Sequence, residues 1–461
     1  MHEPFDIAAD LDTPVSAFLK LEGLNPRFLL ESVEGGERLA RYSFLGFGDA
    51  LEVRMTSDAL TINGETRQRP ESQQAYLDAL RDAMTRVPPL APDVDGLPFK
   101  GGLVGVSGYD VVRLFERLPT LVDKQTSVPD AAFTAPSSLL VFDHLTRRVA
   151  LLHAGSDQER RALRDEVIHR LNGPVPRPQG EVTIGAAEAS FTEEEFCQRV
   201  DACKEYIASG DIYQIVLSVL FRGKTNVSPF EVYRAMRLIN PSPYMFFFRF
   251  DDLSVVGSSP EALVRLNGST ASLRPIAGTL PRGATPGEDV ANEEKLLADP
   301  KEAAEHVMLV DLARNDLGRV ASAGSVHVDP YRSIERYSHV MHIVSGVKGE
   351  LDPRYDQFDL FAASFPAGTL VGAPKVRAME IIEEMESVGR GLYAGTAGYF
   401  GASGDMDQAI TIRTLVFSGD EYSFQAGAGI VADSVPAREY QEVLAKSAIL
   451  RRALEMAGDG L

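Results

Sequence analysis

Tryptophan is absent from this chain of 461 residues, and cysteine occurs only twice. Both cysteines, Cys197 and Cys203, fall in one predicted helix and lack the spacing of a metal site. We interpret them as small core residues of a protein that resides in a reducing compartment. A protein that must be made while tryptophan is scarce would avoid that residue, although chance explains its absence at least as well.

The chain also lacks long hydrophobic runs and an excess of positive charge. No apolar stretch approaches the ~18 residues of a transmembrane helix, and the opening MHEPFDIAAD has no apolar segment typical of a secretory signal. We therefore expect a cytoplasmic protein with no membrane partner. A formal net charge of −20 argues against nucleic acid as a partner. Because this charge also repels anionic substrates, a site for one must carry its own cations.

What is present is an ordinary globular composition, with 44% hydrophobic and 24% charged residues. Residues 1–170 alternate short apolar runs with Gly and Asp turns, which indicates a strand-rich N-terminal region. The proline-rich start of residues 171–190 predicts a linker, and stronger helix signals follow in the region 191–461. Strands and helices come in runs without regular βαβ alternation, which favours an α+β fold.

Local signals place several elements. Thr192 and Glu195 have the spacing of a capping box, and so do Ser228 and Glu231, each at the start of a predicted helix. The apolar patterns predict a helix over 72–85, two long helices over 300–315 and 436–456, and strands over 213–220, 244–250 and 253–257.

Two Glu-x-x-Glu pairs stand out on the two long predicted helices, Glu302/Glu305 and Glu439/Glu442. A spacing of three places each pair on one helix face, which is most often a solvated surface. The apolar run over 307–312 indicates instead that the first helix is largely buried. If the pairs converge, like charges about 4 Å apart cost roughly 4 kcal/mol per contact at an effective dielectric near 20, so they need protonation or a cation. Oxygen ligands of this kind favour Mg²⁺ over Zn²⁺.

Several further motifs are weak one by one and specific together. They are PIAGT at 275–279, the helix over 301–316, YSHVMH at 337–342, GAPK at 372–375, GLY at 391–393, the run over 407–414 and AGAG at 426–429. With them the sequence resembles the anthranilate synthase component I family, within the chorismate-utilising enzymes. The resemblance covers nearly the whole chain. It implies two intertwined subdomains whose antiparallel β-sheets pack together, with helices outside.

The resemblance implies a magnesium cofactor and a chorismate site. Glu305 and Glu442 match the direct Mg²⁺ ligands, and Glu302 and Glu439 match residues that hold metal-bound waters. Arg413 matches a residue that grips a substrate carboxylate, because a planar guanidinium can bond both carboxylate oxygens. The implied substrate-binding residues are Gly278, Thr279, Tyr393, Arg413, Gly427, Ala428, Gly429 and Lys446.

Four further positions bear on the reaction that the resemblance implies. Glu261 matches the general acid that protonates the departing C4 hydroxyl, and His342 matches the histidine that handles protons during pyruvate elimination. Gln214 stands where isochorismate and salicylate synthases have a water-activating lysine. Ala277 stands where common aminodeoxychorismate synthases have a nucleophilic lysine. An external nucleophile, ammonia, is therefore expected, supplied from glutamine by a separate amidotransferase subunit (component II) in a hetero-oligomer.

The resemblance also implies feedback inhibition by L-tryptophan. The segments over 29–32 and 240–245 match those that bind the inhibitor in this family, and they lie in different predicted subdomains. The matching residues are Glu31, Ser32, Pro243, Tyr244 and Met245. One departure from the family pattern is Leu280, where relatives commonly have arginine, so the details of the substrate pocket at this point are open.

Three alternatives remain beside this interpretation. One is an enzyme that stops at 2-amino-2-deoxyisochorismate, a second is a synthase of the para-aminobenzoate pathway, and a third is a catalytically inactive regulatory homologue. A dinucleotide fingerprint can also be read at Gly427-x-Gly429-x-x-Ala432, but the βαβ context that such a site needs is missing from the sequence pattern.

Overall fold

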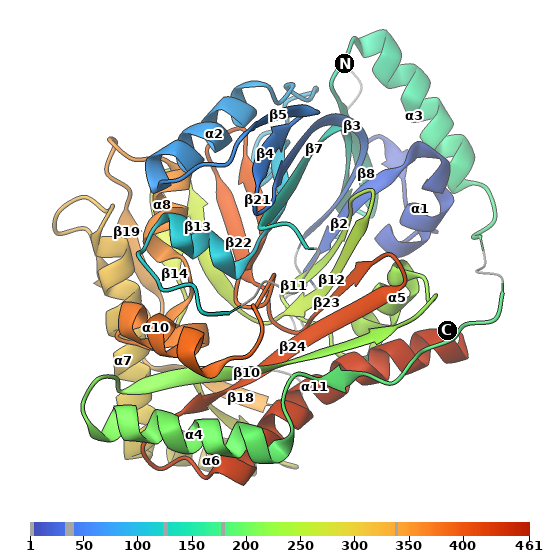
Figure 1. Ribbon diagram of the computed structural model, residues 1–461. Helices are drawn as coiled ribbons and strands as arrows, with labels where there is room; N and C mark the ends of the chain where they lie inside the picture. The colour runs from blue at the N-terminus through green and yellow to red at the C-terminus, as the bar shows by residue number, and fades with distance from the viewer. Residues whose placement is uncertain (1–3, 33–40, 123–127, 177–179, 337–339) are drawn as a thin grey trace.

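The computed structural model describes residues 4–32, 41–122, 128–176, 180–336 and 340–461. Residues 337–339 of the YSHVMH motif and residues 177–179 of the predicted linker lie outside these ranges. Within them the chain forms antiparallel β-sheets with helices around the outside (Figure 1).

The helices are α1 (Pro14–Lys20), α2 (Gln73–Thr85), α3 (Asp157–Leu171), α4 (Glu193–Ala208), α5 (Pro229–Ile239), α6 (Pro286–Ala298), α7 (Pro300–Gly318), α8 (Gln357–Ser364), α9 (Gly368–Val371), α10 (Lys375–Met385) and α11 (Pro436–Asp459). Two short 3₁₀ turns cover Glu22–Leu24 and Tyr109–Leu114.

The strands of the N-terminal region are β1 (Ile7–Ala8), β2 (Pro26–Glu31), β3 (Tyr42–Met55), β4 (Ala59–Ile62), β5 (Glu65–Gln68), β6 (Gly102–Ser107), β7 (Ala131–Asp143) and β8 (Arg148–His153). Those that follow are β9 (Glu188–Ala189), β10 (Gln214–Lys224), β11 (Tyr244–Arg249), β12 (Leu253–Ser259), β13 (Ala262–Asn267), β14 (Thr270–Leu273), β15 (Ile276–Pro281), β16 (His327–Val328), β17 (Ser333–Arg336), β18 (Val340–Val344), β19 (Val347–Glu350), β20 (Gly372–Ala373), β21 (Thr396–Gly401), β22 (Met406–Ile410), β23 (Thr414–Ser418) and β24 (Glu421–Ile430).

Strand pairing joins the two halves of the chain. β2 pairs with β11, and β6 pairs with β21, so strands of residues 1–170 and of residues 191–461 belong to one hydrogen-bonded network. A separate small sheet has the order β15–β18–β17. This arrangement confirms the α+β class and the intertwined antiparallel architecture.

The cores are also shared between the halves. One cluster of buried side chains brings Phe28 of β2 and Phe99 together with Phe248 of β11 and Tyr399 of β21. Burying one large apolar side chain contributes about 1.5–3 kcal/mol, so these contacts hold the two halves together over a wide area.

The local helix signals are confirmed with one exception. Ser72 caps α2, and Thr192 and Glu195 form the complete capping box of α4. At α5, however, Ser228 is the cap residue but makes no side-chain bond to the helix, and the Glu231 carboxylate is taken by Arg234 at 2.5 Å. The second predicted capping box is therefore wrong, because the ion pair competes for the glutamate.

The helix α7 is amphipathic and not buried all round. Asp299 caps it by accepting from the amides of Lys301 and Glu302 at 2.8 and 3.2 Å, and proline follows at the first helical position. His306 is fully buried, but Val307 is 44% exposed. The prediction of a largely buried helix is wrong for this face, because a continuous apolar run hides the period of 3.6 residues.

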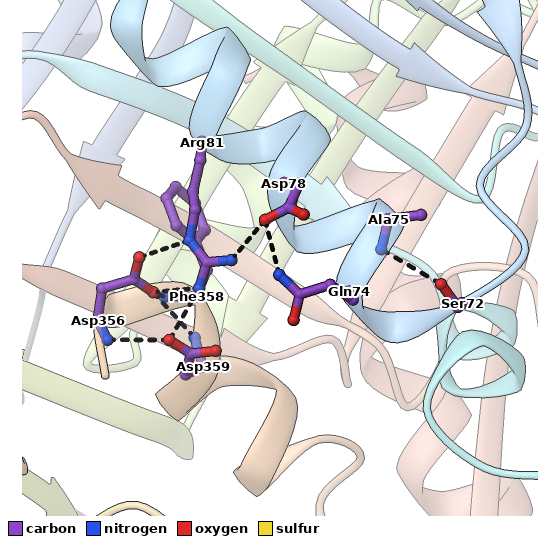
Figure 2. A network of polar contacts seen from close by, with 8 residues as sticks. All are labelled: Ser72, Gln74, Ala75, Asp78, Arg81, Asp356, Phe358 and Asp359. Carbon is purple, nitrogen blue, oxygen red and sulfur yellow. Dashed lines mark hydrogen bonds and ion pairs between the residues drawn. The ribbon is translucent and has the colours of Figure 1, made fainter. Parts of the chain in front are cut away.

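A polar network docks α2 of the N-terminal half against α8 of the C-terminal half (Figure 2). The Arg81 guanidinium donates to Asp356 at 2.7 Å and to Asp359 at 2.8 Å, and it also pairs with Asp78 of its own helix at 2.9 Å. Asp356 in turn caps α8. One arginine therefore serves both an inter-element contact and a helix terminus.

Candidate active site

A polar pocket with a volume of about 410 Å³ opens where β10 and β24 meet α7 and α11. β10 pairs with β24 from Ile215 to Lys224, the two strands cross the lower half of Figure 1, and α11 packs against β24. The predicted site residues that line this pocket are Gln214, Glu261, Glu305, Tyr393, Arg413, Gly427, Gly429, Glu439, Glu442 and Lys446.

Carboxylates from the two long helices meet in this pocket. Burial raises the pKa of Glu305 above its usual value, and the neighbouring charges of Glu302 and Glu442 raise it further. Lys446 offsets part of this charge through a 2.7 Å contact with Glu442, although both side chains are about half exposed. Glu439 lines the same pocket.

The carboxylate oxygens that the structure describes in this pocket are donors of the kind that magnesium prefers, but they are not gathered into a compact ligand cluster. Oxygen donors from two helices, with a raised carboxyl pKa between them, form the environment that a hard divalent cation relieves. Among the described residues, no three side chains of the His, Cys, Asp or Glu type stand at metal-ligating spacing. Magnesium typically takes only one or two carboxylates directly and keeps waters in its other positions, so the open arrangement suits it.

Arg413 lines the pocket together with the cations Lys301 and Lys446, and its backbone is held in an unusual conformation. Its φ of 49° lies in the left-handed region, which non-glycine residues rarely adopt. The Arg413 carbonyl accepts from the amide of Ser258 at 3.2 Å, which helps hold this corner between β22 and β23. Burial lowers the pKa of Arg413, but a guanidinium stays charged in proteins. Such strain is characteristic of ligand-binding positions.

Gly427 and Gly429 let other groups approach the β24 backbone. A Cβ atom at Gly427 would lie 2.7 Å from the Tyr393 hydroxyl and from the Leu217 carbonyl. A Cβ at Gly429 would lie 2.9 Å from the side-chain nitrogen of Gln214. The Lys446 ammonium donates to the Gly427 carbonyl at 3.0 Å. The predicted requirement for glycine in this segment therefore has a steric cause.

Glu261 has the properties of a proton donor. It precedes β13, and burial raises its pKa to about 7, while the Thr369 hydroxyl and the charge of Arg413 lower it. The Thr369 hydroxyl donates to the Glu261 carboxylate at 3.0 Å. Thr369 itself was not predicted from the sequence, although it lies three residues before the GAPK motif.

His342 lies beside the pocket on the small sheet. Its Nδ1 is 3.0 Å from the Gly278 carbonyl, which can only accept, so this nitrogen carries the proton and Nε2 is the basic atom of the neutral ring. The Thr279 hydroxyl is also 3.0 Å from Nδ1. Burial is the largest cause that lowers the pKa of His342, and the charge of Arg413 adds to it, so the neutral ring is favoured.

Five predicted residues do not line the pocket directly. Gly278, Thr279 and His342 form its flank on β15 and β18, and a Cβ at Gly278 would meet a Glu302 carboxylate oxygen at 3.0 Å. Ala428 is fully buried behind its two glycine neighbours. The structure thus collects most of the predicted site in one pocket and places the remainder around it.

Comparisons with known proteins agree with this geometry. The profile of the family described as chorismate binding enzyme matches residues 25–452. Anthranilate synthase component 1 from Thermus thermophilus is 46% identical over 457 residues, which cover 98% of this chain and 97% of the relative. The chain belongs to this family of chorismate binding enzymes. The component 1 protein from Acetivibrio thermocellus is 42% identical, over 98% of this chain and 95% of its own length.

A solved structure shows the same fold. The crystal structure of anthranilate synthase component I from Streptococcus pneumoniae TIGR4 superposes with a TM-score of 0.81 at 35% sequence identity, covering 96% of this chain and 99% of the other. The family resemblance predicted from the motifs is therefore confirmed.

The sequence resemblance implied that two positions, Gln214 and Ala277, bear on the reaction type. Gln214 lines the pocket from β10, next to the backbone of Gly429. Ala277 is 6% exposed on β15 and pairs with Ile343, and it does not line the pocket itself, although its neighbour Ile276 does. Neither of these positions presents a side-chain nucleophile, as predicted from the sequence.

A second pocket collects the residues predicted to bind an inhibitor. It has a volume of about 280 Å³ and is lined by Glu31, Ser32, Pro243, Tyr244 and Met245, among others. The pairing of β2 with β11 creates it, because Glu31 stands opposite Met245. The Glu31 carboxylate accepts from the Tyr233 hydroxyl at 2.5 Å and from Arg237 at 3.1 Å.

Two predictions about other classes of protein can be checked directly. The Gly427-x-Gly429 segment is the interior of β24, an antiparallel strand, so it is not the strand-to-helix turn of a dinucleotide site. No helix among the described residues has the length and apolar character needed to cross a bilayer.

Proposed function

We propose that the protein is the chorismate-aminating subunit of an anthranilate synthase. The reaction converts chorismate and ammonia into anthranilate, pyruvate and water, and it belongs to the lyases. Relatives named anthranilate synthase component 1, at 42% and 46% identity over nearly the full length, support this proposal.

The observation that carries the proposal is the charge pattern of the 410 Å³ pocket. It combines the cations Arg413 and Lys446, which a dianionic substrate needs in a chain of net charge −20, with carboxylates on two facing helices. The same pocket holds Glu261, whose pKa of about 7 keeps a large protonated fraction at neutral pH. Such pairing of a neutral acid with fixed cations is typical of sites that expel a hydroxyl leaving group.

In the proposed chemistry, ammonia forms a bond to ring carbon C2, the ring double bonds shift, and the C4 hydroxyl leaves with its bonding electrons. Glu261 transfers its proton to that hydroxyl, which departs as water. The ammonium group formed at C2 then loses a proton to solvent. Arg413 holds the enolpyruvyl carboxylate by charge-assisted hydrogen bonds. Glu305 and Glu442 would hold Mg²⁺, and the bound ion would supply positive charge at the ring carboxylate.

The second step breaks the bond between the ring and the enolpyruvyl oxygen. The proton at C2 must leave and a proton must reach the enolpyruvyl methylene carbon, which gives the aromatic ring and pyruvate. The neutral imidazole of His342, with Nδ1 fixed by Gly278, provides a basic Nε2 for this proton handling.

The proposed function also implies a partner subunit and a regulatory ligand. The name component 1 of the relatives supports a separate component 2 partner, and we propose that it delivers ammonia from glutamine. We further propose that L-tryptophan binds the 280 Å³ pocket, whose aromatic and apolar walls suit an indole ring. Because residues of both halves line this pocket, an occupant can bias their relative position.

The direct test supplies the isolated chain with chorismate, Mg²⁺ and an ammonium salt, and follows anthranilate by its fluorescence. Anthranilate should form without a partner and should disappear when a chelator is added. Glu305→Gln should lower kcat by about 100-fold or more, since it removes a charge that the metal needs. The matched control is Asp311→Asn, an exposed carboxylate of the same helix. Equal activity in Glu305→Gln and the control would refute the metal assignment.

A further inference from the structure

Asp316 and Lys375 form an ion pair outside the pocket that is almost entirely withdrawn from solvent. The Lys375 Nζ is 2.7 Å from Asp316 Oδ2, and the two side chains are only 16% and 7% exposed. The same ammonium donates to the Ser364 carbonyl at 3.3 Å. Removing two charges from water costs several kcal/mol per ion, so a buried pair is weak evidence for stability and invites another explanation.

The pair joins α7, whose Glu305 lines the proposed active-site pocket, to α10, which follows the short helix whose Thr369 also lines it. Asp316 lies near the end of α7, the helix that carries Glu302 and Glu305 in its first two turns. Lys375 opens α10, directly after the segment α9–β20 that carries Thr369. The pair therefore ties the carboxylate helix to the segment whose threonine holds Glu261.

Close packing continues from the pair to the pocket. A Cβ atom added at Gly368 would lie 2.9 Å from Leu312 of α7 and 3.4 Å from the side chain of Lys375. Hence α9 rests directly on α7 and on the lysine stem. Because Thr369 follows Gly368 in α9, a shift of the Lys375 side chain would also move Thr369.

A small cavity separates the ion pair from the proposed acid. It has a volume of about 40 Å³, and both Glu261 and Asp316 line it, together with Thr369. No side chain of the described residues fills the space between these groups, so the distance between Glu261 and α7 depends on how the surrounding helices are held. The Asp316–Lys375 ion pair holds α7 against α10.

We propose that the Asp316–Lys375 pair is a positioning device, which sets α7 against the α9–α10 segment so that Glu305 and Glu261 keep their working separation. The proposal rests on the function proposed above. It assigns neither residue a contact with substrate. Their effect on turnover passes through Thr369 and the first turns of α7.

The first test compares single variants of the pair. Asp316→Asn and Lys375→Met should each lower kcat for anthranilate by about tenfold or more, since small misplacements of reacting groups are costly. Each should also raise the Mg²⁺ concentration needed for half-maximal activity. Lys375→Arg keeps the charge and should recover most of the loss. The exposed Asp311–Arg314 pair of the same helix supplies the control, and Asp311→Asn should change neither quantity.

The double variant Asp316→Asn/Lys375→Met separates positioning from stability. Each single variant strands a buried charge and should lower Tm, whereas the double variant removes both charges and should recover Tm. If the pair positions the site, kcat stays low in the double variant although Tm recovers. If kcat recovers together with Tm, the pair is only structural and the proposal fails.

Amide hydrogen exchange gives a readout that needs no turnover. In the double variant, exchange should rise in Gly368–Val371 and in the first turns of α7, and it should stay unchanged in Asp311→Asn. Unchanged exchange in both segments would overturn the proposal. If the wild-type chain makes no anthranilate, the proposed function fails, while this exchange comparison still decides whether the pair positions these segments.

Discussion

The 410 Å³ and 280 Å³ pockets differ in which parts of the chain line them and in the character of their lining residues. All residues that line the 410 Å³ active-site pocket fall between Gln214 and Leu450, whereas the 280 Å³ pocket takes residues from both halves of the chain. Charged side chains such as Glu305, Arg413 and Lys446 line the first pocket. Aromatic side chains such as Phe44, Phe246 and Tyr399 line the second. The two pockets share no lining residue.

The charges of the two pockets also differ in their partners. In the second pocket Arg265 pairs with Asp407 at 3.0 Å, and Glu31 is bound by Arg237. In the active-site pocket, none of the described residues forms an ion pair with Arg413. Lys446 pairs with Glu442 in that pocket, whereas Arg413 remains available to a ligand. The charges named in the second pocket are already paired and frame a site that recognises shape. The contrast predicts that activity and inhibition can be lost separately.

The largest expected effect is at Glu261. Glu261→Gln cannot donate a proton as a carboxylic acid, so kcat should fall by about 100- to 10,000-fold. Binding of L-tryptophan, measured by calorimetry, should match that of the wild type because the second pocket is untouched. Loss of tryptophan binding in this variant would show that a change in the first pocket alters ligand binding in the second, and would contradict the separation of activity from inhibition.

An intermediate effect is expected from Ser32→Phe in the second pocket. The added ring occupies space in the cavity, so the inhibition constant for tryptophan should rise by about tenfold or more, which corresponds to roughly 1.4 kcal/mol. Uninhibited kcat should stay within about twofold of wild type, as should both properties of the control Ser32→Ala. Unchanged inhibition in Ser32→Phe would contradict the assignment of this pocket.

The smallest effect, a shift in pH dependence, is expected at Thr369. Glu261 must be protonated to act, so kcat/KM should be present below its pKa of about 7 and should fall as the pH rises through it. The Thr369 hydroxyl stabilises the ionised form and lowers this pKa. Thr369→Val should therefore move the basic limb of the pH profile to higher pH, whereas Thr369→Ser should leave it in place. A limb at lower pH in Thr369→Val would refute the role of this hydrogen bond.

Features that depend on neighbouring residues or on family motifs could be predicted from the sequence. The cap at Thr192 and the start of α7 at Pro300 follow from nearest neighbours, and the structure confirms both. The family motifs led to Arg413 and Gly429, which the fold places in one pocket. The predicted linker at residues 171–190 runs from the last residue of α3 to just past β9, and strand pairing crosses between the two regions that it separates in sequence.

Contacts between distant segments could not be predicted. A single threonine hydroxyl such as that of Thr369 has no spacing pattern, and its bond to Glu261 forms only once the fold brings α9 close to Glu261. The same holds for the Asp316–Lys375 pair, which joins two helices far apart in the chain. The exposure of Val307 was missed because burial depends on which face meets the sheet, and a uniform apolar run does not specify the face.

The most direct test of the account is the identity of the product. The isolated chain, given chorismate, Mg²⁺ and ¹⁵N-labelled ammonium, should yield anthranilate with the label in its amino group and an equal amount of pyruvate, both measured by mass spectrometry. A labelled product that retains the enolpyruvyl group, or a hydroxylated product without the label, would contradict the assignment of this pocket to anthranilate synthesis.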